Sequence, residues 1–286
     1  MTSQKGHQYI EVPFNRAQWH LHEVMRQELA QIVANSGKFD SLAQRRKLGS
    51  AALHLIMVAS EPSLLLRVPH FPHENLLGEV LAEGAAPKIR FACERARRLA
   101  KQGLKSIVWS TFRQNVESMA DQLRDLRAVY IHGGIDAGDQ DDDSTREGRI
   151  KQFRNDPHCY VMVANPAAAA EGISLHRICR HAIYVDRTYN AAHYLQSEDR
   201  IHRLGLGPDE SPTIEILFCP GSIDESVRDR LEAKVNAMAA ALDDPSLTIR
   251  AHQYVPFDLD DDPEADSGLI EEDDVGSILE WLRRAE

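Results

Sequence analysis

Apolar residues follow two different periods along this chain, and the change falls near residue 105. Before it, apolar residues recur every three or four positions, as they do on the buried side of an amphipathic helix. After it, short apolar runs alternate with stretches of helical period. The runs are Ser106–Ser110, Ala128–Ile131, Tyr160–Ala164, His181–Val185 and Ile214–Phe218. This alternation predicts an α/β fold: a parallel sheet with helices on both faces and right-handed crossovers.

The same pattern divides the chain into three parts. Residues 1–87 are predicted to form an N-terminal helical segment and a connector rich in proline and glycine. Residues 88–243 are predicted to form the α/β lobe. Residues 244–286 are expected to be an acidic, largely disordered tail, because acidic segments with few aromatic residues cannot bury a core. Within it, Val275–Arg284 has the pattern of a short amphipathic helix, which either docks on the body or a partner or frays in solvent.

Small and polar residues directly follow four of the predicted strands. They are Ser110–Thr111, Gly133–Gly134, Asn165–Gly172 and Asp186. Ligands of parallel sheets gather at the carboxyl ends of the strands, so we expect these residues along one ligand-binding edge. At Ser110–Thr111 a strand turns into a helix, where hydroxyls and backbone N–H groups can hold a phosphate. An ordinary helix N-cap explains the same two residues equally well.

Two arginines lie in the sequence Gln-Ser-Glu-Asp-Arg-Ile-His-Arg, which occupies residues 196–203. No glycine or proline interrupts residues 188–204, so we expect a helix with Gln196, Arg200 and Arg203 on a shared face. Guanidinium groups match phosphate oxygens in both shape and charge. We therefore predict a phosphate-facing surface that points toward the strand-end edge. The alternative is a solvated face on which the two neighbouring carboxylates pair with the arginines.

The net charge of −11 is unevenly distributed. Residues 254–286 contain 12 acidic and 2 basic residues, so the other 253 residues carry a net charge of only −1. A nearly neutral body can still present a basic groove to nucleic acid, because binding depends on where the charges lie. The densest basic cluster, within residues 88–102, is explained either by a solvated helix face or by contact with a DNA backbone.

Four cysteines lie far apart in the sequence, and no Cys-x-x-Cys pair occurs. The sequence therefore predicts buried cysteines, with neither a disulfide framework nor a metal site. The longest apolar run is too short to cross a bilayer, and no basic-plus-apolar leader opens the chain. We expect a cytoplasmic protein without a membrane partner.

Taken together, these segments resemble the second RecA-like lobe, the helicase C-terminal domain, of Swi/Snf-type ATP-dependent DNA translocases, which belong to the superfamily-two helicases. Residues 196–205 are similar to the family's motif VI, QxxDRxHRxG, which is the most specific of the matches. The similar segments, in chain order, are residues 60–65, 107–112 (motif IV), 130–153, 171–175 (the end of motif V), 185–190, 196–205 (motif VI) and 221–225. The resemblance covers roughly residues 8–240 and keeps the family's motif order.

The resemblance implies roles for individual residues. Arg203 is implied to be an arginine finger that approaches the nucleotide, and Arg200 a second phosphate or coupling contact. The residues implied on the ATP side are Gln196, Gly172 and Glu171, and those implied to contact the DNA backbone are Ser110, Thr111, Gly133 and Ser174. The implied partners are double-stranded DNA, ATP with Mg²⁺, and a first RecA-like lobe in the same chain or in another. The protein is then expected to be intracellular and DNA-associated.

The sequence departs from the family pattern at several positions. Ala169–Ala170 and Ser174 stand where motif V has glycines and an asparagine, Tyr189 replaces a tryptophan, and Leu206 replaces a glutamine. Neither GxxxxGK[ST] nor a DExH motif occurs in these 286 residues, so the lysine and magnesium ligands that hold a nucleotide are missing.

Two hypotheses follow from these departures. In the first hypothesis, ATP is bound mainly by residues of a separate first lobe, and this chain alone has no ATPase activity. In the second, the chain is a degenerate helicase lobe that acts as a non-catalytic DNA- or protein-binding module, with its acidic tail recruiting a protein partner.

Overall fold

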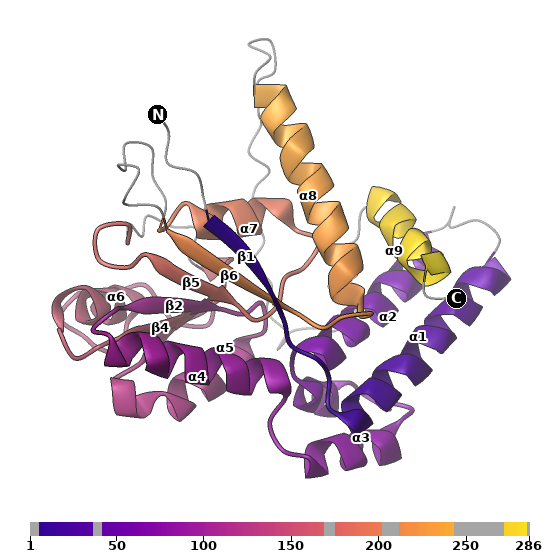
Figure 1. Ribbon diagram of the computed structural model, residues 1–286, viewed down its shortest axis with the longest axis horizontal. Coiled ribbons are helices and arrows are strands. Elements are labelled where there is room, and N and C mark those ends of the chain that lie inside the picture. Colours follow the sequence, from indigo (N-terminus) through magenta and orange to yellow (C-terminus); the bar gives the residue numbers. More distant parts are fainter. Residues whose placement is uncertain (1–5, 37–41, 169–174, 202–211, 243–271, 285–286) are drawn as a thin grey trace.

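The computed structural model describes residues 6–36, 42–168, 175–201, 212–242 and 272–284. In these ranges, six parallel strands form one sheet in the order β1-β6-β5-β2-β4-β3 (Figure 1). They are β1 (Gly6–Glu11), β2 (Ser106–Trp109), β3 (Val129–Ile131), β4 (Val161–Ala164), β5 (His181–Tyr184) and β6 (Thr213–Phe218). Strands β2 to β6 coincide with the five apolar runs, so the predicted α/β fold is confirmed.

Helices cover both faces of this sheet. They are α1 (Arg16–Ser36), α2 (Leu42–Ser60), α3 (Glu74–Ala82), α4 (Pro87–Lys101), α5 (Arg113–Gln122), α6 (Arg146–Asn155), α7 (Ala191–Glu198), α8 (Ile223–Leu242) and α9 (Glu272–Arg284), with 3₁₀ turns η1 (Pro62–Arg67) and η2 (Arg124–Leu126). Successive residues of β2 point to opposite faces, and each face has its own core. Val108 packs with α4 and α5, whereas Ile107 and Trp109 belong to the larger core shared with α1, α2 and α8.

Strand β1 was not predicted, because residues 1–87 were expected to be helical. It pairs in parallel with β6 from Gly6 opposite Thr213 to Glu11 opposite Phe218, and it forms one border of the sheet. The N-terminal segment that was predicted to be helical thus also contains a strand. Its sequence, GHQYIE, has too few apolar residues to read as a strand, because a border strand is covered on fewer sides.

Strand register defines two edges of the sheet. Gly6, Thr213 and His181 lie side by side at the starts of β1, β6 and β5, and Ser106 of β2 lies opposite His181. We call this side the amino edge and the opposite side the carboxyl edge. All strands are parallel, so the residues that follow each strand meet at the carboxyl edge.

The chain after the sheet forms two helices that lie side by side. α8 extends to Leu242, and α9 lies against α1, α2 and α8 (Figure 1). The apolar side chains of α9 that enter the core are Val275, Ile278, Trp281 and Leu282. Of the alternatives for the C-terminal helix, docking on the body is therefore the one observed. The predicted disorder of the tail concerns residues 243–271, which lie outside the described part of the chain.

Candidate functional site

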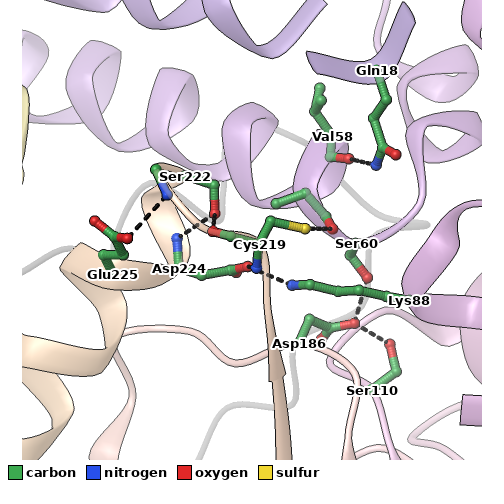
Figure 2. A network of polar contacts seen from close by, with 12 residues as sticks. Gln18, Val58, Ser60, Lys88, Ser110, Asp186, Cys219, Ser222, Asp224 and Glu225 are labelled. Atoms are coloured by element: carbon green, nitrogen blue, oxygen red, sulfur yellow. Dashed lines mark hydrogen bonds and ion pairs between the residues drawn. The ribbon is translucent and has the colours of Figure 1, made fainter. Parts of the chain in front are cut away.

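Asp186 lies at the centre of a buried polar network on the carboxyl edge (Figure 2). It follows β5 and is 2% exposed. Its Oδ2 accepts hydrogen bonds from the hydroxyls of Ser110 and Ser60, each at 2.6 Å, and its Oδ1 accepts one from the backbone N–H of Thr111, also at 2.6 Å. Three donors satisfy the oxygens of a carboxylate that would otherwise be costly to bury. The network thus joins the ends of β2, β5 and α2.

Two asparagines extend this network. Asn115 in α5 donates from Nδ2 to the hydroxyl of Ser60 at 2.9 Å. Asn165, directly after β4, donates to the carbonyl of Thr111, and its Oδ1 accepts from the N–H of Ala167 at 2.8 Å. The polar residues that follow β2, β4 and β5 therefore do meet at one edge, as the sequence predicted.

The network changes how the predicted DNA contacts can work. Ser110 is fully buried and its hydroxyl is bound to Asp186, so this hydroxyl is not available to a phosphate in this structure. The N–H of Thr111 is likewise occupied by Asp186, although its side chain is only half-buried. An internal carboxylate therefore occupies the hydroxyl of Ser110 and the N–H of Thr111, two groups that were expected to face a phosphate.

A second buried pair lies beside the first network. The Nζ of Lys88, in the first turn of α4, lies 2.5 Å from Oδ2 of Asp224 in the first turn of α8 (Figure 2). The same carboxylate oxygen accepts the N–H of Cys219 at 2.8 Å. Burial by itself lowers the pKa of Lys88, but the nearby Asp224 carboxylate outweighs it, so that the pKa lies above its ordinary value. This pair fixes the start of α8 against α4.

Gly133 lies in the exposed loop after β3. The preceding His132 is buried, and its Nε2 lies 2.9 Å from Glu117 of α5, while its Nδ1 accepts the N–H of Gly134 at 3.1 Å. Burial, together with Arg113, lowers the pKa of His132. The loop is thus held from inside while Gly133 faces solvent. Its proposed contact with a DNA backbone is sterically open.

The helix that carries Gln196 is shorter than predicted. α7 begins after Asn190, whose side chain accepts the N–H of His193 at 3.1 Å, and it ends at Glu198. The N–H of Arg200 and of Ile201 then bond to carbonyls three residues back, which makes a turn rather than a continued helix. The predicted shared helical face of Gln196 and Arg200 is therefore wrong. Gln196 is exposed on α7, whereas Arg200 is half-buried in the turn.

Arg200 also lies at the opposite edge from the one expected. Glu198 pairs with His7 of β1 at 2.6 Å, and the carbonyl of Arg200 accepts the N–H of Leu175, which precedes β5, at 2.8 Å. His7 and the start of β5 both belong to the amino edge. α7 therefore runs antiparallel to the strands. The expectation that Arg200 lies at the same edge as the residues around Asp186 is wrong.

Four of the predicted site residues lie outside the described part of the chain. They are Glu171, Gly172, Ser174 and Arg203. Sequence reasoning, in turn, missed Ser60, Lys88, Asn115 and His7, which hold the described site residues in place. The available signal was their position. Ser60 ends an apolar stripe directly before Glu61-Pro62, and Lys88 follows Pro87 at the start of a helix.

The described residues allow three further statements. The four cysteines are free and buried, as predicted. No group of histidine, cysteine, aspartate and glutamate side chains in the described ranges is arranged to hold a metal ion. Of the helices in those ranges, none combines the length and apolarity that crossing a membrane requires.

Comparison with known proteins agrees with this geometry. Residues 88–205 match the family described as "Helicase conserved C-terminal domain". Lymphoid-specific helicase from Homo sapiens is 27% identical over 138 residues, which are 48% of this chain and 15% of that protein. The ATP-dependent helicase fft2 from Schizosaccharomyces pombe is 26% identical over 149 residues, 52% of this chain and 11% of that protein. The chain thus spans only a small part of these relatives.

Solved structures show the same fold. The alignment with the C-terminal part of the Fun30 ATPase domain covers 84% of this chain and 96% of the Fun30 chain, with a TM-score of 0.58 and 16% sequence identity. The Sulfolobus solfataricus SWI2/SNF2 ATPase core in complex with dsDNA aligns with 82% of this chain and 45% of its own, with a TM-score of 0.59 and 17% identity. Residues 88–205 thus form a helicase C-terminal domain, and the motifs, fold and relatives of the chain are similar to those of the C-terminal RecA-like lobe of Snf2-type ATPases.

Proposed function

We propose that this chain is the second motor lobe of an ATP-dependent double-stranded-DNA translocase, which becomes an ATPase only together with a first RecA-like lobe. The observation that carries the proposal is the extent of the structural matches. The chain spans 96% of a C-terminal part of an ATPase domain but only 45% of an ATPase core. The missing phosphate-binding sequence GxxxxGK[ST] agrees with this division, because it is what a first lobe supplies.

The proposed lobe uses its two edges for different ligands. Arg200 and Arg203 serve ATP with Mg²⁺ held by the first lobe, and Gln196, Glu171 and Gly172 are assigned to the same ligand. An arginine finger stabilises the charge that builds on the transferred phosphoryl group. Thr111 and Gly133 serve the DNA backbone on the carboxyl edge, and Ser174 is assigned to the same ligand. Ser110 acts through Asp186, by fixing the loop that carries Thr111.

Reconstitution with a first lobe of a Snf2-type ATPase tests this function. We expect no ATP hydrolysis by the chain alone and DNA-stimulated hydrolysis by the mixture. Arg203→Ala should lower kcat by about 10³-fold or more, which is the usual effect of losing an arginine finger. Arg124→Ala, in exposed η2, is the matched control and should leave the rate unchanged. Full activity of Arg203→Ala would contradict the assignment of the finger.

A second candidate is a non-catalytic binding module, which the alanines and serine in motif V favour. Alanine restricts the backbone where the family has glycine, and it weakens a close approach to phosphate. Duplex-DNA affinity at rising salt separates the two candidates. A lobe that binds phosphates loses affinity for DNA as the salt concentration rises, and the loss is steeper the more phosphates it contacts. A module that binds only proteins, with its acidic tail recruiting the partner, has no DNA affinity to lose.

A further inference from the structure

Asp274 in the first turn of α9 is completely buried and lies between two cations of α8. Its Oδ1 is 2.7 Å from Nε of Arg230 and 2.9 Å from Nζ of Lys234. The two cations are four residues apart, so they share one face of α8. A buried carboxylate paired with two cations is held strongly, and one of the two ion pairs remains when a single cation is removed.

Lys234 has a second partner outside this ion cluster. Its Nζ donates to the backbone carbonyl of Tyr189 at 2.9 Å. Tyr189 is 2% exposed, and its hydroxyl donates to Ser226 of α8 at 3.0 Å. α8 therefore holds this one residue at both its backbone and its side chain. Burial raises the pKa of the Tyr189 hydroxyl, so it remains a donor at neutral pH.

Tyr189 directly precedes the residue that starts α7. Asn190 caps α7 through the N–H of His193, and α7 carries Gln196 and leads into the turn of Arg200. A helix whose cap is displaced frays from that end. The start of α7 is thus tied to α9 through Tyr189, Lys234 and Asp274, although α7 and α9 are far apart in the sequence.

The apolar side of α9 makes this connection conditional on docking. Ile278 and Trp281 are 0% and 3% exposed in the core shared with α1, α2 and α8. When α9 is docked, Asp274 holds the ammonium of Lys234 in place. When α9 leaves, Lys234 loses this buried counter-charge, and its ammonium is held less firmly against the carbonyl of Tyr189. Lysine has many rotamers, so an ordered lysine depends on such a partner.

We propose that α9 is a positioning element for the segment that contains Arg200. Docked α9 orients Lys234, which fixes Tyr189 and the start of α7, and undocked α9 lets this segment loosen. Asp274 and Lys234 are positioning residues that contact neither nucleotide nor DNA. The consequence for ATP hydrolysis rests on the proposed function, whereas the coupling between α9 and α7 does not.

Hydrogen exchange on the full-length chain tests the coupling without any activity. Asp274→Asn should speed the exchange of the amides of α7 and of α9 by about tenfold or more, since each charge-assisted bond contributes strongly to local stability. Lys234→Met should speed α7 alone, because Arg230 still holds Asp274 and α9. Lys234→Arg keeps the charge and the donors, and should restore α7 to within about twofold. Glu280→Gln on the exposed side of α9 is the matched control.

Two results would overturn the proposal. One is exchange in α7 that stays at the wild-type rate while α9 opens. The other is faster exchange shared equally by β2, β4 and β5, which would make Asp274 a general stability residue.

With a first lobe present, Lys234→Met should lower kcat about tenfold while KM for ATP changes less than about twofold, because orientation rather than binding is lost. An unchanged kcat beside a loosened α7 would also overturn the positioning role. If the wild-type mixture does not hydrolyse ATP, the proposed function is contradicted. The coupling between α9 and α7 is then tested by hydrogen exchange alone.

Discussion

The ammonium of Lys88 lies 2.5 Å from the carboxylate of Asp224, and 136 residues of sequence separate the two. Both side chains are nearly inaccessible, at 1% and 8% exposure. The pair joins the first helix of the α/β lobe to the helix that follows its last strand. It therefore closes the lobe between its beginning and its end.

Replacing one member of this pair should be strongly destabilising. Lys88→Met leaves Asp224 buried without its cation, and we expect unfolding free energy to fall by about 3–5 kcal/mol. Urea denaturation of the full chain measures this. Lys101→Met, at the exposed end of the same helix, should change stability by less than about 0.5 kcal/mol. The double variant Lys88→Met with Asp224→Leu should regain part of the loss, and purely additive effects would show that the two charges are not coupled.

The Asp186 carboxylate should contribute to stability through its three donors. Asp186→Asn keeps the volume but replaces an acceptor oxygen with an amide, which cannot accept from Ser60, Ser110 and Thr111 at once. We expect a loss of about 1–3 kcal/mol in unfolding free energy. Asp121→Asn, with a side chain that is 70% exposed, is the control and should have little effect. A wild-type melting curve for Asp186→Asn would show that the network is dispensable.

Stability should fall in mild acid because of His22. Burial in α1 lowers its pKa from 6.5 to about 4, and neither ring nitrogen has a hydrogen-bond partner among the residues that the structure describes. The unfolded chain therefore takes up a proton below pH 6.5 that the folded chain refuses until about pH 4. The contribution is fully present above pH 6.5 and is lost as the pH falls to 4, by about 3 kcal/mol.

The variant His22→Phe tests this pH dependence. Phenylalanine keeps a ring against Phe14 and Trp281 but cannot take up a proton. We expect denaturation midpoints that depend less on pH in this range than those of the wild type. The exposed His20→Phe is the control, and its profile should follow the wild type. If His22→Phe has the wild-type profile, other histidines such as the half-buried His54 account for the loss.

Two glycines should respond in opposite directions to alanine. A Cβ on Gly148 would lie 1.9 Å from the backbone carbonyl oxygen of Asp142, so Gly148→Ala must displace the loop before α6. We expect a loss of about 1–3 kcal/mol, as in an overpacked core. Gly78 in α3 has no atom within 4 Å of such a Cβ, and Gly78→Ala should stabilise by about 0.5–1 kcal/mol. Thermal melts of the two variants compare them directly, and a matching shift in both would contradict the steric argument.

Local pattern was enough to predict most elements of this lobe. Strands β2, β4 and β5 are covered on both faces, so nearly every residue in them is apolar and the runs stand out in the sequence. In α4, Ile89, Ala92, Ala96 and Leu99 recur at helical spacing, and all four are buried. The border strand β1 was not predicted, because it is less covered by other elements and because its partner β6 is about 200 residues away in the sequence.

The candidate site was predicted only in part. Residues directly after strands were brought to one edge because a parallel sheet requires it, and so Thr111, Asn165 and Asp186 do meet. The sequence could not show that Asp186 would occupy the donors of Ser110 and Thr111. That outcome depends on α2, which delivers Ser60 to the same carboxylate.

The sequence by itself determined strands β2 to β6, the motifs near them and the resemblance to the Snf2-type lobe, because these depend on the period and spacing of neighbouring residues. Only the tertiary structure decided that α7 ends at Glu198, that Arg200 lies at the amino edge and that α9 docks through Asp274. The physical reason is that buried charges and hydrogen-bond donors choose partners by distance in space. His7 with Glu198, and Lys234 with Tyr189 and Asp274, are contacts that no local pattern encodes.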